Sequence, residues 1–254
     1  MRPEPGLRIE HAELSLIGDR EDNQDRVAVA AEEKAAFLIV IDGMGGHSDG
    51  NRAADTALKS LLDSFRQTPL PMFDPIGFLH LSLSRAHDEV AKLGKNQSID
   101  TRPRATIAVC LVQEGAAYWA HVGDSRVYHI RGGKILQRTR DHSHVELLLR
   151  EGKITEEEIP NHPMRNFVEC CLGGDPAIPE MTLSPRQRLA PGDVLLLCTD
   201  GIWANLRDPD IAAFFRDEGQ DLRAWLEALG RRAVQASAPF SDNSTAAVLR
   251  WLGS

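Results

Sequence analysis

The order of strand-like and helix-like segments constrains the fold of this chain more than any other feature. Segments with alternating or continuously apolar residues predict strands, and apolar residues at three- to four-residue spacing predict helices. Strands are expected near 7–17, 26–31, 36–42, 106–112, 116–122, 125–131, 134–139, 193–198 and 245–251, and helices near 53–65, 76–93, 208–217 and 220–236. Strands thus come in consecutive runs and helices in pairs, which is not the βαβα alternation of a parallel sheet.

This grouping predicts an α+β fold, with antiparallel sheets and with helices on the outer faces. The four middle strands are expected to form one antiparallel meander, with turns at 113–115 and 132–133. A length of 254 residues, of which 42% are hydrophobic, suits one domain spanning residues 1–254. Residues 141–178 are irregular and are expected to form a flap, whose histidines His142, His144 and His162 should be solvated or structural.

Composition excludes several classes of function. The formal net charge of −8 argues against a nucleic-acid surface, which needs clustered Lys and Arg. Four cysteines, two of them adjacent and two inside apolar strands, predict buried reduced thiols and no disulfide framework or zinc site. The N-terminus lacks an apolar leader, and no stretch approaches the ~18 apolar residues of a membrane span. A soluble, cytoplasmic protein without a membrane partner is therefore expected.

Three aspartates stand where an apolar strand breaks into glycine or asparagine. They are Asp42 in FLIVIDGMGGH, Asp200 in VLLLCTDGIW and Asp242 in FSDNSTAAVL. Carboxylates at the ends of distant strands tend to converge on a cation, and hard oxygen ligands favour Mg²⁺ or Mn²⁺ over zinc. Each aspartate taken alone also fits a turn, because Asp readily bonds the nearby backbone. Together they predict a metal-dependent hydrolase.

Two further motifs carry candidate phosphate and metal contacts. The motif RxxNxD contains Arg20, Asn23 and Asp25, and GDSR occupies residues 123–126 between two predicted strands. A guanidinium can bind a phosphate through two parallel hydrogen bonds, and Asp25 could then face the metal. On their own, these motifs leave open a solvated surface arginine and a tight turn.

Five motifs in order carry a family resemblance: RxxNxD (20–25), DGMGGH (42–47), GDSR (123–126), TDG (199–201) and SDN (241–243). The chain resembles the metal-dependent protein phosphatases, the type 2C Ser/Thr phosphatases, in their bacterial form that consists of the catalytic domain only. The resemblance runs from about residue 8 to residue 251. It implies a four-layer α-β-β-α sandwich and hydrolysis of phosphoserine and phosphothreonine. Water activated by two metal ions would attack in one in-line step, without a phosphoenzyme.

The resemblance also implies a role for each acidic motif residue. Asp42 would bridge two Mn²⁺ or Mg²⁺ ions, and Gly43 would offer its backbone carbonyl to one of them. Asp200 and Asp242 would bind the other ion, and Asp25 would act mainly through bound water.

The remaining motif residues complete the expected site. Asp124 would help to hold a third, weaker metal ion, Arg20 would bind the substrate phosphate, and Asn243 would support the Asp242 loop. Some relatives place a histidine directly after the Asp-Gly pair as a general acid, whereas this chain has Met44 there. His47 is the candidate acid or supporting residue nearby, because a histidine titrates close to neutral pH.

Expected partners are phosphorylated proteins, including a Ser/Thr kinase or its substrates. Two alternatives stay open. A non-catalytic sensor or binding module could share this fold, although such a module would be expected to lack one of the metal aspartates, and all are present. A metal phosphoesterase for small phosphates is disfavoured only by the resemblance.

Overall fold

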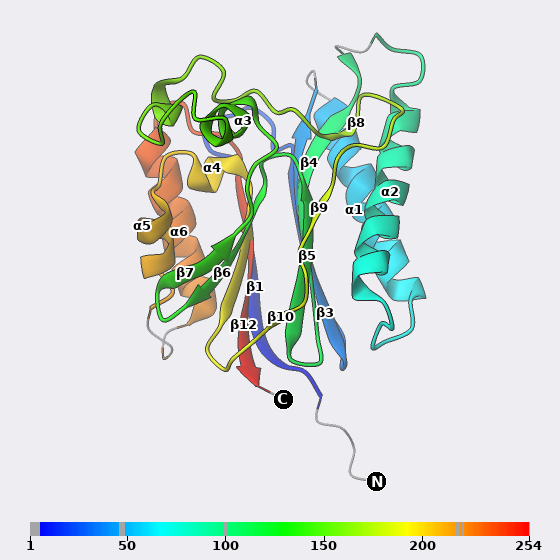
Figure 1. The fold of residues 1–254 in the computed structure, drawn as a ribbon, viewed down its shortest axis with the longest axis vertical. Helices are drawn as coiled ribbons and strands as arrows, with labels where there is room; N and C mark the ends of the chain where they lie inside the picture. Colours follow the sequence, from blue (N-terminus) through cyan, green and yellow to red (C-terminus); the bar gives the residue numbers. More distant parts are fainter. Residues whose placement is uncertain (1–5, 46–48, 99–100, 217–218, 220, 254) are drawn as a thin grey trace.

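Two antiparallel β-sheets lie face to face at the centre of the molecule, and helices cover their outer faces (Figure 1). The computed structural model describes residues 6–45, 49–98, 101–216, 219 and 221–253. The strands are β1 (Arg8–Leu16), β2 (Asp25–Ala31), β3 (Ala35–Met44), β4 (Arg104–Gln113), β5 (Ala116–Val122), β6 (Arg126–Arg131), β7 (Lys134–Arg138), β8 (Leu172–Gly173), β9 (Thr182–Leu183), β10 (Gln187–Arg188), β11 (Val194–Cys198) and β12 (Ser244–Gly253). The helices are α1 (Asp49–Gln67), α2 (Pro75–Leu93), α3 (His144–Arg150), α4 (Asp200–Trp203), α5 (Asp208–Ala213) and α6 (Leu222–Ser237), with a 3₁₀ turn at Ile159–Asn161.

The strand order explains how the two sheets divide the chain. One sheet runs β1-β12-β11-β6-β7, and the other runs β10-β5-β4-β3-β2, with β8 beside β4 and β9 beside β5. Helices α1 and α2 cover the second sheet, and α4 to α6 cover the first. The predicted α+β sandwich with helices on its outer faces is thus confirmed.

The hydrophobic core forms three layers, one between the sheets and one under each set of helices. Strand β3 packs against two of these layers, one on each of its faces. Phe37, Ile39 and Ile41 pack under α1 and α2, whereas Leu38 and Val40 face the other sheet. A strand buried on both faces needs a continuous apolar run, because alternate side chains point to opposite sides. This run holds the strand end that carries Asp42 in a fixed position.

Local sequence sets the helix boundaries. In α2 the Asp74 carboxylate accepts a hydrogen bond from the Gly77 amide at 2.9 Å, and Pro75 occupies the first turn. Helix α4 is a single turn that begins at Asp200, where the sequence predicted only a turn. Helix α5 ends at Ala213, earlier than predicted. No helix in the described part of the chain is long and apolar enough to cross a membrane.

The prediction of one meander over the four middle strands was wrong. Strands β4 and β5 pair in one sheet and β6 and β7 pair in the other, so the chain crosses between sheets at residues 123–125. The free edge of β5 is taken by the short strands β9 and β10, and β6 pairs with β11 instead. Alternation predicts that a segment is a strand but does not specify which neighbour it pairs with.

The cysteines are all free thiols, as predicted. Cys110 and Cys198 are buried inside strands, whereas Cys170 and Cys171 are partly exposed. The prediction that all four are buried was therefore wrong for the adjacent pair, which lies in the irregular segment and not in a sheet.

A buried ionic cluster fixes the start of β11, at the turn that carries Asp193. This carboxylate has no exposed surface and accepts hydrogen bonds from His129 Nε2 at 2.9 Å, Arg131 Nη2 at 2.8 Å and the Ala190 amide at 2.9 Å. Burial alone would raise the pKa of Asp193, but the hydrogen bonds from Arg131 and His129 lower it well below its usual value. The cluster therefore stabilises the folded protein while Asp193 is ionised.

We expect Asp193→Asn to lower the free energy of unfolding by about 2–3 kcal/mol, because the Arg131 guanidinium loses its counter-charge. Urea unfolding at neutral pH measures this loss, and Arg131→Ala should cost less because that arginine is half exposed. Since the folded pKa lies below the unfolded value of about 3.9, the difference should persist above pH 4 and shrink in stronger acid. Equal stability of the variant and wild type at neutral pH would contradict this role.

Candidate metal centre

The candidate site lies at one end of the sandwich, where the chain repeatedly passes between the two sheets. Arg20 is in the β1–β2 connection, Asp42 is near the end of β3, and Asp124 is in the β5–β6 crossing. Asp200 follows β11, and Asp242 precedes β12. All five line one pocket of about 690 Å³. Gly43 and Asn243 line it as well.

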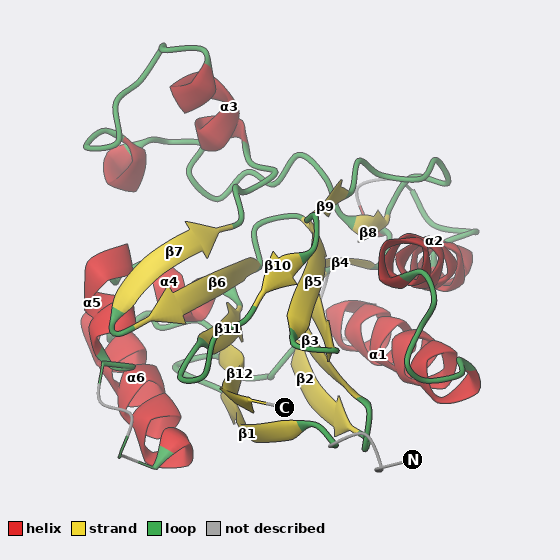
Figure 2. Cartoon of the chain, turned by 60° about the horizontal axis from the view of Figure 1, so that its bottom comes forward, coloured by secondary structure: helices red, strands yellow, loops and turns green. Residues whose placement is uncertain are grey.

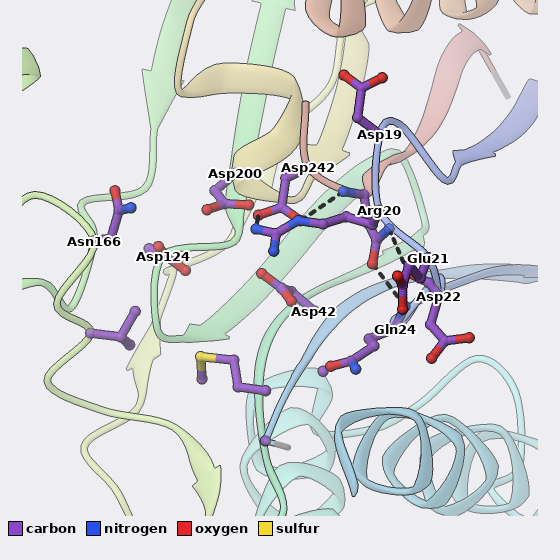
Figure 3. Close-up of a pocket in the computed structure, with 15 residues that line it drawn as sticks. Asp19, Arg20, Glu21, Asp22, Gln24, Asp42, Asp124, Asn166, Asp200 and Asp242 are labelled. Atoms are coloured by element: carbon purple, nitrogen blue, oxygen red, sulfur yellow. Dashed lines mark hydrogen bonds and ion pairs between the residues drawn. The ribbon is translucent and has the colours of Figure 1, made fainter. Parts of the chain in front are cut away.

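The pocket is strongly acidic. In Figure 3 the carboxylates of Asp42, Asp124, Asp200 and Asp242 point toward a common space, with the Arg20 guanidinium beside Asp242. Three further carboxylates line its mouth, on Asp19, Glu21 and Asp22. Arg20 is the one cationic side chain among the described residues that line the pocket. Such an excess of negative charge suits a site for cations.

Asp25 does not line the pocket but lies directly behind it. It is opposite Asp42 in the β2–β3 register and is only 3% exposed. Its carboxylate accepts a hydrogen bond from the Thr199 hydroxyl at 2.8 Å, and Thr199 directly precedes Asp200. Asp25, at the start of β2 in one sheet, is thus hydrogen-bonded to Thr199, which follows β11 in the other sheet.

The crowding of these carboxylates disfavours their charged forms. Burial, and then repulsion from Asp25 and Asp200, raises the pKa of Asp42 well above its usual value. Burial and repulsion from Asp200 also raise the pKa of Asp124. Burial is the main cause that raises the pKa of Asp25 to about 7 and that of Asp200 to about 6. A cation placed among these groups would favour their ionised forms, because opposite charge offsets both burial and mutual repulsion.

The backbone at Gly43 allows close packing beside the pocket. Its amide donates to the Gln24 carbonyl at 3.2 Å. A Cβ at this position would collide with the carbonyl oxygens of Gly50 and Gln24, so any other residue would push the start of α1 away from β3. Glycine therefore keeps the predicted carbonyl ligand at the pocket wall.

Hydrogen bonds tie the Arg20 loop to the Asp242 loop. Arg20 Nη2 donates to Asp242 Oδ2 at 2.7 Å. The Asn243 side chain donates to the carbonyls of Ile17 at 2.9 Å and Asp22 at 3.0 Å, and its Oδ1 accepts from the Gln24 amide at 2.8 Å. These contacts place Asn243 between the two loops, where it was predicted to support Asp242.

The donor set fits hard divalent ions that keep part of their water shell. No three Asp, Glu, His or Cys side chains in the described ranges are arranged to hold one ion by themselves. Magnesium is usually bound by one or two carboxylates, and water and phosphate oxygens complete its coordination shell. Carboxylates such as that of Asp42, together with a backbone carbonyl and water, would suit such ions better than a closed protein cage.

The predicted proton donor is His47. His47 lies outside the described residues, and Met44 lines the pocket at the position where some relatives have a histidine.

Sequence reasoning missed the residues that surround Asp124. The Arg126 side chain is 12% exposed, and its guanidinium binds the Asp141 carboxylate through two hydrogen bonds of 2.8 and 2.7 Å. The same guanidinium lies 3.4 Å from the centre of the Trp203 ring. Both residues stand close to motif aspartates in the sequence, because Arg126 ends the GDSR motif and Trp203 is one helical turn after Asp200. Their positions could therefore have marked them as part of the site. Their shared contact depends on folding and could not be read from spacing.

Comparison with known proteins decides the family. The model of the family described as protein phosphatase 2C matches residues 15–238. The chain belongs to the protein phosphatase 2C family. Protein phosphatase PhpP of Streptococcus pneumoniae is 33% identical over 198 residues, which cover 75% of this chain and 78% of that protein. Serine/threonine phosphatase stp of Listeria innocua is 31% identical over 187 residues, covering 72% and 73%.

Solved structures of protein phosphatase 2C relatives share the fold. The serine/threonine phosphatase of S. agalactiae matches with a TM-score of 0.85 and 28% identity, over 97% of this chain and 100% of that one. The catalytic domain of serine/threonine protein phosphatase PstP, in complex with two manganese ions, matches with a TM-score of 0.80 and 26% identity, over 96% and 99%. The predicted family, fold and activity class, a metal-dependent protein-serine/threonine phosphatase, are confirmed at the level of the family.

We expect Asp42→Asn to stabilise the metal-free protein and to weaken its stabilisation by metal. The amide removes one of several repelling charges, so the melting temperature in EDTA should rise, by about 2–4 °C for each ~1 kcal/mol relieved. The further rise on adding Mn²⁺ should be smaller than in wild type, because a ligand is lost. Scanning fluorimetry with EDTA and with Mn²⁺ measures both shifts. Asp88→Asn, an exposed change of the same charge on α2, is the control and should alter neither.

Proposed function

We propose that this chain hydrolyses phosphoserine and phosphothreonine in proteins at a centre of two Mn²⁺ or Mg²⁺ ions, with a third, weaker ion beside it. The observation that carries the proposal is the convergence of Asp42, Asp124, Asp200 and Asp242 with Arg20 in one pocket. A phosphomonoester needs both a cationic environment and a group that holds its oxygens, and this pocket offers residues for each.

The acidic residues would hold the ions as the sequence predicted. Asp42 would be shared between two ions, Gly43 would contribute its carbonyl, and Asp200 and Asp242 would bind on the other side. Asp25, buried behind Asp42, would orient bound water. When bound, the ions would neutralise phosphate charge and lower the pKa of bound water toward neutrality, which suits the predicted hydrolysis in one in-line displacement.

Arg20 would bind the substrate phosphate. Its side chain is more than half exposed at the pocket, and its guanidinium already contacts a carboxylate, Asp242. A phosphate dianion presents the same kind of acceptor oxygens, so it can replace the carboxylate as the partner of the guanidinium. Arg20 would then orient the phosphorus atom for attack, and His47 stays the candidate acid for the leaving oxygen.

The segment 141–178 would act as a flap of the single catalytic domain. With α3 it projects beyond the layers of the sandwich (Figure 2). Asn166 and Val168 of this segment line the catalytic pocket. A protein substrate entering the pocket would therefore touch it. We propose phosphorylated proteins as substrates, among them a Ser/Thr kinase or the proteins that such a kinase phosphorylates.

We expect purified protein with Mn²⁺ to release phosphate from p-nitrophenyl phosphate and from phosphothreonine peptides, and EDTA to abolish both activities. Asp42→Asn should remove nearly all turnover. Metal-replete protein that releases no phosphate would favour the sensor-module alternative. Faster turnover of nucleotides than of phosphopeptides would favour the small-phosphate alternative.

A second prediction isolates the phosphate-binding role. Arg20→Ala should raise KM for a phosphopeptide about 10- to 100-fold, the effect of losing charged hydrogen bonds of about 1.5–3 kcal/mol, with a smaller change in kcat. Arg85→Ala, which removes an exposed arginine from α2, is the matched control and should leave both constants unchanged. An Arg20→Ala enzyme with wild-type KM would contradict the assignment.

A further inference from the structure

The turn that carries Asp124 is held by two side chains outside the proposed ligand set. The Trp203 indole N–H donates to the Asp124 carbonyl at 3.1 Å. His142 holds the preceding residue from the other side, because its backbone N–H donates to the Gly123 carbonyl at 2.9 Å and its Nδ1 accepts from the Gly123 amide at 3.3 Å. Both backbone polar groups of Gly123 are thus bonded to one residue.

This turn needs such support. Gly123 has a φ of +98°, a conformation that favours glycine and provides no side chain to pack. The Asp124 side chain is only 7% exposed and is repelled by its neighbours Asp200 and Asp141. Because the segment crosses between the two sheets, it lacks the continuous strand pairing that fixes Asp42 in β3.

Several contacts fix the position of Trp203. Its indole lies on α4, one turn after Asp200, and the Arg126 guanidinium covers its ring at 3.4 Å from the centre. Arg126 is held in turn by the Asp141 carboxylate. Trp203 therefore links the backbone of Asp124 to α4, the helix that begins with Asp200.

The hydrogen bonds of His142 select one tautomer. Because Nδ1 accepts from the Gly123 amide, the proton is on Nε2, which donates to the Thr182 hydroxyl at 2.8 Å. The ring stacks on His121 at a centroid distance of 4.5 Å, and His121 Nε2 donates to the Arg140 carbonyl at 2.7 Å. A neutral His142 with a fixed ring is what an acceptor for Gly123 requires.

We propose that Trp203 and His142 are positioning residues that hold Asp124 for the weakest metal site. The inference rests on the proposed function, which assigns Asp124 to that site. Outer contacts that orient a ligand typically change metal affinity 10- to 100-fold when removed. Because Trp203 is on the same short helix as Asp200, it also makes the geometry of the weakest site depend on that of the main centre.

The test is a calorimetric titration of the EDTA-treated full chain with Mn²⁺. Trp203→Phe keeps a ring beneath Arg126 but removes the N–H donor, and it should weaken the last Mn²⁺ step about tenfold while leaving the tighter steps within about twofold. His142→Ala should do the same. His142→Asn, whose Oδ1 can accept from the Gly123 amide, should recover most of the affinity. Trp225→Phe is the matched control, since Trp225 also lies under an arginine, Arg250, but on α6 away from the pocket.

Asp124→Asn separates this inference from the proposed function. If it leaves the last Mn²⁺ step unchanged, or if wild type shows only two steps, the assignment of Asp124 fails and the positioning inference fails with it. If Asp124→Asn weakens that step but Trp203→Phe and His142→Ala do not, only the positioning inference is overturned. Equal weakening of every step together with a lower melting temperature would show a general structural role and would also overturn it.

Discussion

Electrostatic repulsion among buried carboxylates is the constraint on which the rest of this structure depends. Asp25, Asp42, Asp124 and Asp200 all have a raised pKa, with burial as the main cause and neighbouring carboxylates adding to it. Folding must therefore hold together groups that favour separation. Strands β3 and β11, which end here, are buried on both faces, so their ends cannot move apart without disrupting the core. A cation bound among these groups would offset the repulsion by opposite charge.

The site belongs to neither sheet alone. Asp25 and Asp42 come from neighbouring strands of one sheet, while Asp200 and Asp242 flank strands of the other. Asp124 lies on a segment that crosses between them. The relative position of the carboxylates is consequently set by the apolar layer between the sheets, which includes Leu38 and Val40 of β3 and Leu195 and Leu197 of β11. Packing in that layer thus helps to set the geometry of the candidate metal centre.

The sequence predicted most of this arrangement wherever local pattern is sufficient. The two-faced burial of β3 follows from its continuous apolar run, and the ordered motifs identified the family. Pattern could not place β6 beside β11 in the first sheet, because period-two alternation does not show which strands pair. It could not reveal that Arg126 and Trp203 meet either, since residues 77 positions apart become neighbours only when β6 pairs with β11. Sequence motifs thus singled out charged residues that line one pocket, but not the side chains that support Asp124.

The contact between Arg20 and Asp242 is compatible with the roles proposed for both residues, one toward substrate and one toward metal. Arg20 bonds Oδ2 of Asp242, whereas the Asn243 amide donates to Oδ1 at 2.8 Å. If Arg20 turns to a substrate phosphate, the Asn243 amide still orients the carboxylate and Oδ2 becomes available as a ligand. The Asn243 side chain is bonded at the same time to the loop that carries Arg20. If Arg20 exchanged partners, the Asn243 hydrogen bonds that join the two loops would not be broken by that exchange.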